Sequence, residues 1–406
     1  MPKRLPRIAQ FDGLRGMLSL WVVLAHCFCW AGFSQLGWGS LVDHCWKWFV
    51  IARPAVETFV ILSGFAIAYF LDRDRLPWLG FVTQRFFRIF PVYLLCLLFA
   101  FVLIPLSARI VFTVDWQTTE YFQSLQQIAL QDHQNQSLNL LSHLAGLHGA
   151  VPKTVKPECE YTILPPAWSI SIEWQYYLLA PLLYPLMRRP ISMAATFLGV
   201  LILQSLLGSH GNTAFVLTWL PLFFVGVGSF SIYKSLHQSE YQPGREAEWV
   251  VVGIVGVACF AEWHPFAICL WTLVFGGVFV RSEGFLGQFL HDLRLLFQGR
   301  MFQFLGKVSY SLYLIHWPMI VLILGLTTQM IPDLNRQTAL LILLFLGFPM
   351  ILASSWIVHV FVECPGMEIG KQLQKKPERY SLGSQKGNED SRGATEYLGT
   401  PRTAGL

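Results

Sequence analysis

Three residues near the N-terminus, Asp12, Arg15 and His26, carry ionisable side chains inside a stretch that is otherwise apolar enough to enter a bilayer. On an α-helix, the eleven steps from Arg15 to His26 return to within about 20° of the starting direction, so both side chains share one face. They lie about 16 Å apart along the axis, which is about half the thickness of the apolar core of a membrane. Because ionisable groups at such depth are costly, this stripe indicates a functional site.

The composition is that of an integral membrane protein. The chain has 406 residues, of which 54% are hydrophobic and only 13% are charged, whereas soluble domains average about 25% charged residues. The net charge of +5 comes from basic residues in short loops between apolar runs, which favours membrane topology over a nucleic-acid partner. The eight cysteines show no CxxC or Cys/His ligand spacing, so we expect no metal site.

The apolar runs predict an all-α, polytopic bundle of about ten transmembrane helices. Most Lys and Arg residues fall on the side of the N-terminus, which predicts that both termini are cytoplasmic. We expect a transmembrane domain over residues 1–371 and a disordered cytoplasmic tail over 372–406, where the sequence becomes charged and rich in Gly and Ser. The predicted spans cover roughly 13–32, 54–71, 90–106, 167–187, 191–208, 213–233, 249–262, 264–280, 306–326 and 338–361.

The one long loop, from about 107 to 166, is predicted to be external. Within it, Leu138, Leu141, Leu144 and Leu147 recur every three residues. This pattern predicts a helix that lies on the membrane surface or caps the bundle.

The depths of three polar residues suggest an acid–base centre. Glu57 and Glu173 should lie about 5 and 9 Å below the outer face, and His26 about 20 Å above the inner one. All three could therefore meet in the outer half of the bundle, where a histidine beside carboxylates suits a general base. The alternative is that each residue only makes hydrogen bonds between helices. Ser169 or Ser171 as a nucleophile activated by His26 is conceivable, although serines between helices mostly serve packing.

On the inner side, Arg85 and Arg88 lie close to the start of the third predicted span. Together with Arg15 they form a basic cluster able to bind phosphate groups through guanidinium forks. The alternative is simple anchoring by the positive-inside rule. A further polar group, His316, lies in the ninth predicted span, just before Pro318.

The chain resembles the acyltransferase 3 family of membrane enzymes in several sequence blocks that follow the family's order. The spacing of Arg15 and His26 is similar to the family's Arg-x10-His motif. The blocks are Phe11-Asp-Gly-Leu-Arg-Gly16, Val56-Glu-Thr-Phe-Val-Ile-Leu-Ser-Gly-Phe65, Arg85-Phe-Phe-Arg88, Trp168-Ser-Ile-Ser-Ile-Glu173, Leu305-Gly-Lys-Val-Ser-Tyr-Ser-Leu-Tyr-Leu-Ile-His-Trp-Pro318 and Glu363-Cys-Pro365.

The resemblance implies transfer of an acyl group, most simply acetyl from cytoplasmic acetyl-CoA, to a hydroxyl group of an extracytoplasmic carbohydrate or lipid-linked glycan. It implies that Arg15, Arg85 and Arg88 hold the acyl-CoA, that His26 is the general base, and that Asp12 orients Arg15. Glu173 is expected to position the sugar or tune His26. The substrate-binding candidates are Glu57, Ser171 and His316.

Several alternatives stay open at this point. A covalent acyl-His26 intermediate is an alternative to direct transfer, and the donor could carry a succinyl or longer acyl group. A transporter or flippase could use the same ionisable residues as a gated polar path, and a noncatalytic scaffold is disfavoured by the buried charges. The expected location is a bacterial cytoplasmic membrane or a plasma membrane, with the lipid bilayer as a permanent partner.

Overall fold

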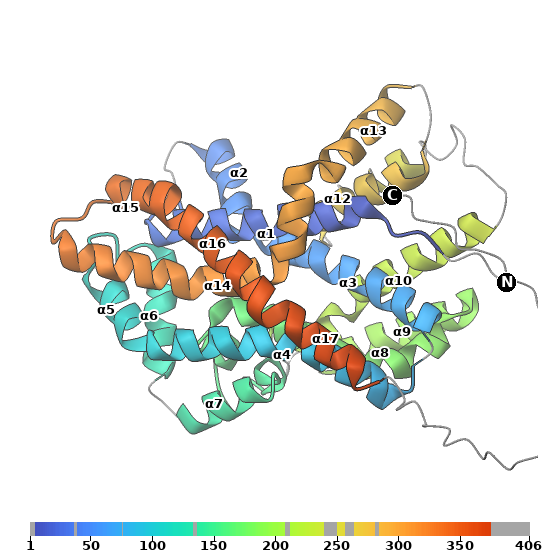
Figure 1. Cartoon of the computed structure of the whole chain (residues 1–406), viewed down its shortest axis with the longest axis horizontal. Helices are drawn as coiled ribbons and strands as arrows, with labels where there is room; N and C mark the ends of the chain where they lie inside the picture. The colour runs from blue at the N-terminus through green and yellow to red at the C-terminus, as the bar shows by residue number, and fades with distance from the viewer. Residues whose placement is uncertain are drawn as a thin grey trace, which may run out of the picture.

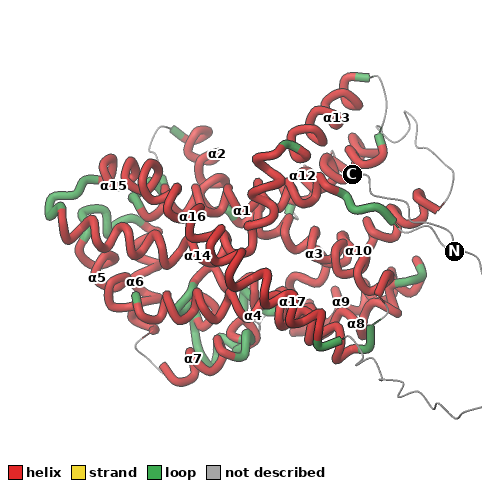
Figure 2. Tube along the Cα trace, viewed as in Figure 1, coloured by secondary structure: helices red, strands yellow, loops and turns green. Residues whose placement is uncertain are grey.

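The computed structural model is a bundle of helices, with no strand among the residues it describes (Figures 1 and 2). Most of the longer helices run roughly along the long axis of the molecule, and α13 projects to one side (Figure 1). The described residues are 5–35, 39–74, 76–132, 136–207, 212–238, 250–255, 264–280 and 284–374.

Several consecutive helices are separated by only a few residues, as expected for a chain of apolar spans. The α-helices are α1 (Ala9–Trp30), α2 (Ser40–Ile51), α3 (Arg53–Asp74), α4 (Trp78–Val102), α5 (Ile104–Thr113), α6 (Glu120–Asp132), α7 (Gln136–Leu144), α8 (Trp168–Leu183), α9 (Pro190–Leu207), α10 (Val216–Gln238), α12 (Pro265–Phe279), α13 (Phe285–Gln298), α14 (Arg300–Met330), α15 (Arg336–Ile342), α16 (Phe348–Val358) and α17 (Cys364–Gln372). Short 3-10 turns cover His148–Ala150 (η1), Cys159–Tyr161 (η2), Pro165–Ala167 (η3) and Tyr184–Met187 (η4), and π-helical turns cover Leu343–Gly347 (η5) and His359–Glu363 (η6).

Seven helical stretches within the described ranges are long and apolar enough to cross a membrane: α1, α3, α4, α9, α10, α14 and the continuous stretch Arg336–Gln372. This confirms an all-helical integral membrane protein. The predicted spans 167–187 and 264–280 correspond to the shorter helices α8, of 16 residues, and α12, of 15. The predicted span 249–262 and the tail 372–406 lie largely outside the described residues, so the count of ten and the orientation stay predictions.

The centre of the bundle is the packing of α1 against α14. Gly16 and Gly306 allow the two backbones to touch, because a Cβ on Gly306 would lie 2.1 Å from the carbonyl oxygen of Asp12. A Cβ on Gly16 would lie 2.6 Å from the backbone nitrogen of Gly306. Small residues at such contacts are a general means of packing helices in membranes. The two helices are therefore held at a fixed register.

A second close contact joins α3 to α10. A Cβ on Gly64 would lie 2.3 Å from the carbonyl oxygen of Phe223, and one on Gly226 would lie 2.0 Å from that of Ile61. Helix α8 packs against both α3 and α4 and completes the walls around the polar interior. The polar side chains of the sequence blocks thus come from helices whose backbones are closely packed.

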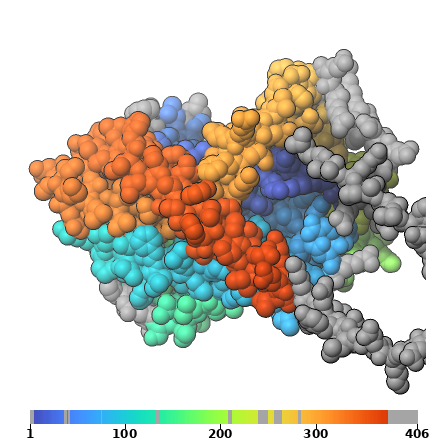
Figure 3. Space-filling model, viewed as in Figure 1, coloured from blue at the N-terminus to red at the C-terminus, as the bar shows by residue number. Residues whose placement is uncertain are grey.

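The outer surface of the bundle carries many large apolar side chains. Helix α9 exposes Ile191, Leu198, Ile202 and Leu206, and only Val200 of this helix is buried. The C-terminal stretch through α16 and α17 lies as a ridge across the face seen in Figure 3, against α14 and α4. Because lipid rather than water surrounds a membrane bundle, such an apolar exterior needs no protein partner.

The segment between α4 and α8 folds into the helices α5, α6 and α7 and the short turns η1 to η3. The helix predicted from the leucine spacing is present as α7, which exposes Leu141 and Leu144. The ring of His143, on α7, stacks on that of His148, in η1, with their centroids 3.9 Å apart, and both side chains are fully buried. This segment closes one end of the bundle.

Candidate functional site

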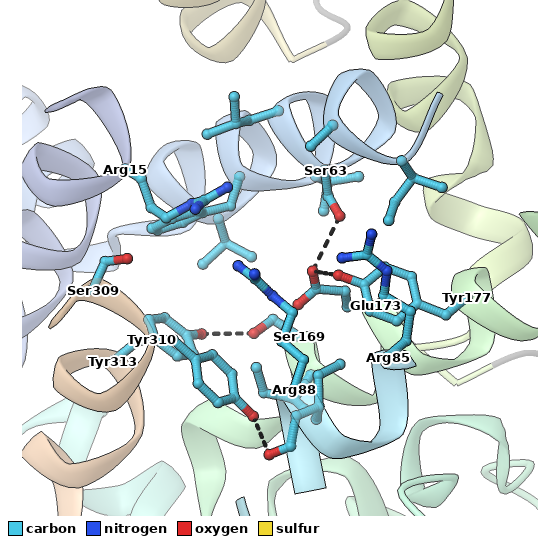
Figure 4. Close-up of a pocket in the computed structure, with 18 of the residues that line it drawn as sticks. Arg15, Ser63, Arg85, Arg88, Ser169, Glu173, Tyr177, Ser309, Tyr310 and Tyr313 are labelled. Atoms are coloured by element: carbon cyan, nitrogen blue, oxygen red, sulfur yellow. Dashed lines mark hydrogen bonds between the residues drawn. The ribbon is translucent and has the colours of Figure 1, made fainter. Parts of the chain in front are cut away.

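A cavity of about 300 Å³ opens between α1, α3, α4, α8 and α14, and we call it the arginine cavity. Figure 4 shows Arg15 entering it from α1, Arg85 and Arg88 from α4, and Glu173 and Tyr177 from α8. The three arginines predicted to act together are therefore brought to one site. With Arg7 and Asp12 included, the lining holds four arginines and two carboxylates, an excess of positive charge suited to an anion.

Aromatic rings rather than a carboxylate hold Arg85. Its guanidinium carbon lies 4.2 Å from the ring centroid of Phe70, 5.3 Å from that of Phe81 and 5.5 Å from that of Tyr177. These cation–π contacts fix the planar group without neutralising it. The Nε atom of Arg85 is buried and has no hydrogen-bond partner within the described part of the chain. A buried donor without a partner is destabilising, so the guanidinium of Arg85 is not fully satisfied by the described residues.

Glu173 belongs to the arginine cavity and not to the surroundings of His26. Its Oε1 accepts a hydrogen bond of 3.1 Å from the hydroxyl of Ser63 and another from the hydroxyl of Tyr177. The predicted meeting of His26, Glu57 and Glu173 is thus wrong in its arrangement. The sequence predicts a similar depth for all three, but the helices turn their side chains toward different neighbours.

Asp12 also differs from its predicted contact. Its carboxylate accepts hydrogen bonds from Arg7, at 2.9 Å from Nε and 2.8 Å from the terminal nitrogen. The hydrogen bonds of Asp12 therefore orient Arg7 at the mouth of the cavity instead of Arg15. Both residues still line the arginine cavity with Arg15.

A second cavity, of about 480 Å³, lies toward the other end of α1, and we call it the histidine cavity. Its wall includes His26 and a set of aromatic side chains from α6, η2, α8, α10 and α14. Arg53, which also lines it, donates to Glu57 at 3.1 Å and lies 5.7 Å from the ring centroid of Trp219. The aromatic lining consists of Tyr121, Tyr161, Trp168, Trp219, Tyr313 and Trp317.

The ring of His26 is oriented by a second histidine. His26 Nδ1 lies 3.0 Å from His316 Nε2, and His316 Nδ1 lies 3.3 Å from the carbonyl oxygen of Leu312. Because a carbonyl oxygen only accepts, His316 carries its proton on Nδ1 and accepts at Nε2. His26 Nδ1 is then the donor, which leaves the lone pair of His26 Nε2 available as a base. The ring centroid of Trp317 lies 5.4 Å from that of His26, and the two rings are nearly perpendicular.

Equal spacing on two helices explains why these histidines meet. Gly16 and His26 are ten residues apart on α1, and Gly306 and His316 are ten residues apart on α14. Starting from the glycine contact, both helices therefore rise by about 15 Å before they reach their histidine. The pair follows from the register set by the glycines.

Two further candidates, Glu57 and Ser171, lie outside both cavities. Glu57 is buried between Arg53 and His264, whose Nδ1 is 2.8 Å from its carboxylate. The hydroxyl of Ser171 donates to the carbonyl of Gly146 at 2.8 Å and accepts from the backbone N–H of Gly149 at 3.0 Å. Ser171 therefore ties α8 to the preceding loop. The geometry gives it a structural contact where a substrate contact was expected.

A sequence profile described as an acyltransferase domain matches residues 8–360. The chain belongs to the acyltransferase 3 family. Its arginine cavity and its paired histidines thus lie in a membrane protein of an acyltransferase family.

One relative of this acyltransferase 3 protein is the acyltransferase MdmB of Streptomyces mycarofaciens, which is 28% identical over 189 residues. That match covers 47% of this chain and 42% of the relative, so the chain spans less than half of the relative's length. No solved structure matches the chain.

Sequence reasoning about the acyltransferase 3 motifs missed the aromatic wall of the histidine cavity. Trp219 lies on α10 and Tyr121 on α6, and neither belongs to a block that drew attention. Tyr313 and Trp317 stand in the block around His316, where the sequence does not distinguish an aromatic residue that lines a cavity from one that packs in the core. A polar residue inside an apolar run is visible in a sequence, whereas an aromatic residue in a chain rich in them is not.

Proposed function

We propose that this protein transfers an acyl group, most simply acetyl, from acyl-CoA to a hydroxyl group of a carbohydrate acceptor. The observation that supports this is the pairing of the arginine cavity at one end of α1 with the histidine cavity at the other. One suits an anionic donor and the other suits a neutral acceptor. In this proposal the arginine cavity faces the cytoplasm, where acyl-CoA is found.

The donor would bind through its phosphates. Coenzyme A carries a diphosphate and a further phosphate, and guanidinium groups bind phosphate oxygens through paired hydrogen bonds. Arg15, Arg85 and Arg88 approach the arginine cavity from two helices. Glu173, held by Ser63 and Tyr177, balances part of this charge so that the cluster stays packed when the donor has left.

The acceptor would bind against the aromatic rings of the histidine cavity. The charge of Arg53 is balanced by Glu57, and the other charged residue on the lining is Glu158, so the cavity offers no net attraction to an anion. Trp168 and Trp219 lie with their ring centroids 5.2 Å apart on its wall. Large flat rings beside polar groups suit a sugar, whose ring has apolar C–H faces and polar edges.

The chemical step would use His26 as the general base. Its Nε2 takes the proton of the acceptor hydroxyl as the oxygen attacks the thioester carbon. The C–S bond then breaks, and the proton on Nε2 passes to the departing CoA thiolate. His316 is a positioning residue in this scheme, because it fixes the tautomer of His26.

The decisive experiment measures acetyl-CoA binding and acyl transfer by the purified, full-length protein. We expect wild-type protein to bind acetyl-CoA, and envelope glycans from cells carrying the gene to gain acetyl esters by mass spectrometry. His26→Ala should bind acetyl-CoA and fail to transfer. Full transfer by His26→Ala contradicts the role of the base, and substrate flux without acetyl-CoA binding favours a flippase.

A further inference from the structure

The arginine cavity and the histidine cavity share two lining residues, Val56 on α3 and Tyr313 on α14. Arg15, Arg85 and Arg88 line only the first cavity, and His26 lines only the second. A donor held by the arginines must therefore place its thioester beside Val56 and Tyr313 to bring it near His26. We call these two residues the neck.

Tyr313 is held in place at the neck from two directions. Its hydroxyl lies 2.8 Å from the hydroxyl of Ser169 and donates to the carbonyl of Pro166 at 3.0 Å. Ser169 lines the arginine cavity, whereas Pro166 lines the histidine cavity. The ring also packs against Phe59, with centroids 6.1 Å apart. Tyr313 is therefore held in one orientation where the two cavities adjoin.

We propose that the neck determines which acyl groups the enzyme accepts, by limiting how many carbons fit between the thioester and the wall. This inference rests on the proposed function, since it needs acyl-CoA in the arginine cavity. Val56 is only 5% exposed and is the smaller of the two neck side chains. Its replacement by alanine opens space without removing a hydrogen bond, so an acyl chain can extend where the valine methyl groups were.

The chain supplies matched controls for this test. Val60 lies one turn from Val56 on α3 and lines only the arginine cavity, and Val22 on α1 lines only the histidine cavity. All three valines are buried, at 1%, 5% and 6% exposure for Val22, Val56 and Val60. The changes Val22→Ala, Val56→Ala and Val60→Ala therefore remove the same atoms from similar environments, and only one of them widens the neck.

The experiment measures the affinities of CoA, acetyl-CoA, butyryl-CoA and hexanoyl-CoA for the purified full-length protein by competition with labelled CoA. In Val56→Ala, the affinity for butyryl-CoA relative to CoA should rise about fourfold for each methylene group that becomes buried. In Val60→Ala and Val22→Ala the ratio should stay within twofold of wild type. Val56→Leu, which narrows the neck, should lower the ratio for butyryl-CoA.

The outcomes distinguish failure of the proposed function from failure of the proposal about the neck. If wild-type protein binds neither CoA nor acetyl-CoA, the proposed function fails. If it binds both but Val56→Ala changes the ratios no more than Val60→Ala, the neck does not select the acyl group. If Val56→Ala elutes as aggregate in size-exclusion chromatography, Val56→Leu tests the same proposal. A narrower neck should lower the affinity for butyryl-CoA relative to CoA, and an unchanged ratio would contradict the proposal.

Discussion

The two cavities differ in how their polar groups are balanced. In the arginine cavity, Arg85 is held by aromatic rings and retains its charge, with a buried Nε that makes no hydrogen bond within the described part of the chain. In the histidine cavity, Arg53 is paired with Glu57, and His26 is held by His316. The arginine cavity thus retains unpaired positive charge for an anion, whereas the histidine cavity has its arginine paired and offers aromatic rings, a neutral base and the buried hydroxyl of Tyr121, which has no hydrogen-bond partner among the described residues.

This difference predicts that the cavities can be disabled separately. Damage to the arginine cavity should weaken donor binding, and damage to the histidine cavity should slow transfer while donor binding persists. A variant that loses both functions together without unfolding would show that the division is wrong.

The largest effect is expected for His26→Ala. Loss of a general base typically lowers kcat by about 10²- to 10⁴-fold, and the affinity for CoA should stay within twofold of wild type because His26 does not line the arginine cavity. Single-turnover transfer from labelled acetyl-CoA measures the first quantity, and competition binding measures the second. A large loss of CoA affinity would contradict the separation of the cavities.

Arg85→Ala should lower the affinity for CoA by about ten- to a hundredfold, because it removes charge-assisted hydrogen bonds to phosphate. The matched control is Arg73→Ala, which removes an exposed arginine that is paired with Asp74 at 2.6 Å and does not line the cavity. Binding measured at two salt concentrations should show a weaker salt dependence for Arg85→Ala than for Arg73→Ala. Equal CoA affinity and equal salt dependence of the two variants would show that Arg85 does not bind the donor.

His316→Phe should lower kcat by about tenfold, because His26 loses the acceptor that fixes its tautomer. His316→Gln retains an acceptor oxygen and should recover part of the rate. The pH profile of kcat, recorded for both variants, distinguishes positioning from packing, since a packing defect would lower the rate equally at every pH. Full activity of His316→Phe would show that His26 needs no partner.

The smallest effect concerns the segment between α4 and α8, which contributes Tyr121 and Tyr161 to the histidine cavity. His148 Nε2 donates to the carbonyl of Ala167, next to Trp168 on the cavity wall, and His148 Nδ1 is buried with no hydrogen-bond partner among the described residues. Burial lowers the pKa of His148 to about 4. Because the unfolded chain binds this proton at about pH 6.5, the free energy of unfolding should fall as the pH drops from 6.5 toward 4.

Thermal unfolding between pH 7 and pH 4.5 tests this expectation, with a melting temperature that falls by a few degrees. His148→Phe should reduce the pH dependence, and His143, whose pKa burial also lowers, should account for part of what remains. Retention of CoA binding at pH 5 would show that the loss of stability does not reach the arginine cavity. An unchanged melting temperature would contradict the assigned cost of protonating His148.

The parts of the site that could be predicted from the sequence are the residues that are unusual for a membrane span. Arg15, Arg85 and Arg88 could be grouped from their place near the inner ends of apolar runs, and the structure brings them together. The sequence misplaced Glu173, because residue counting gives height along a helix but not the direction in which the helix turns its side chains. That direction is set by contacts such as Gly64 against Phe223, which depend on the whole bundle.

The contact of Gly16 with Gly306 has a consequence for how these two segments can vary. A substitution between the glycines and the histidines changes one side chain, but an insertion or deletion of one residue rotates everything beyond it by about 100° and shifts it by about 1.5 Å. His26 would then face away from His316, even with every neighbouring residue type retained. The length of these two ten-residue intervals is therefore more tightly constrained than the identity of the residues within them.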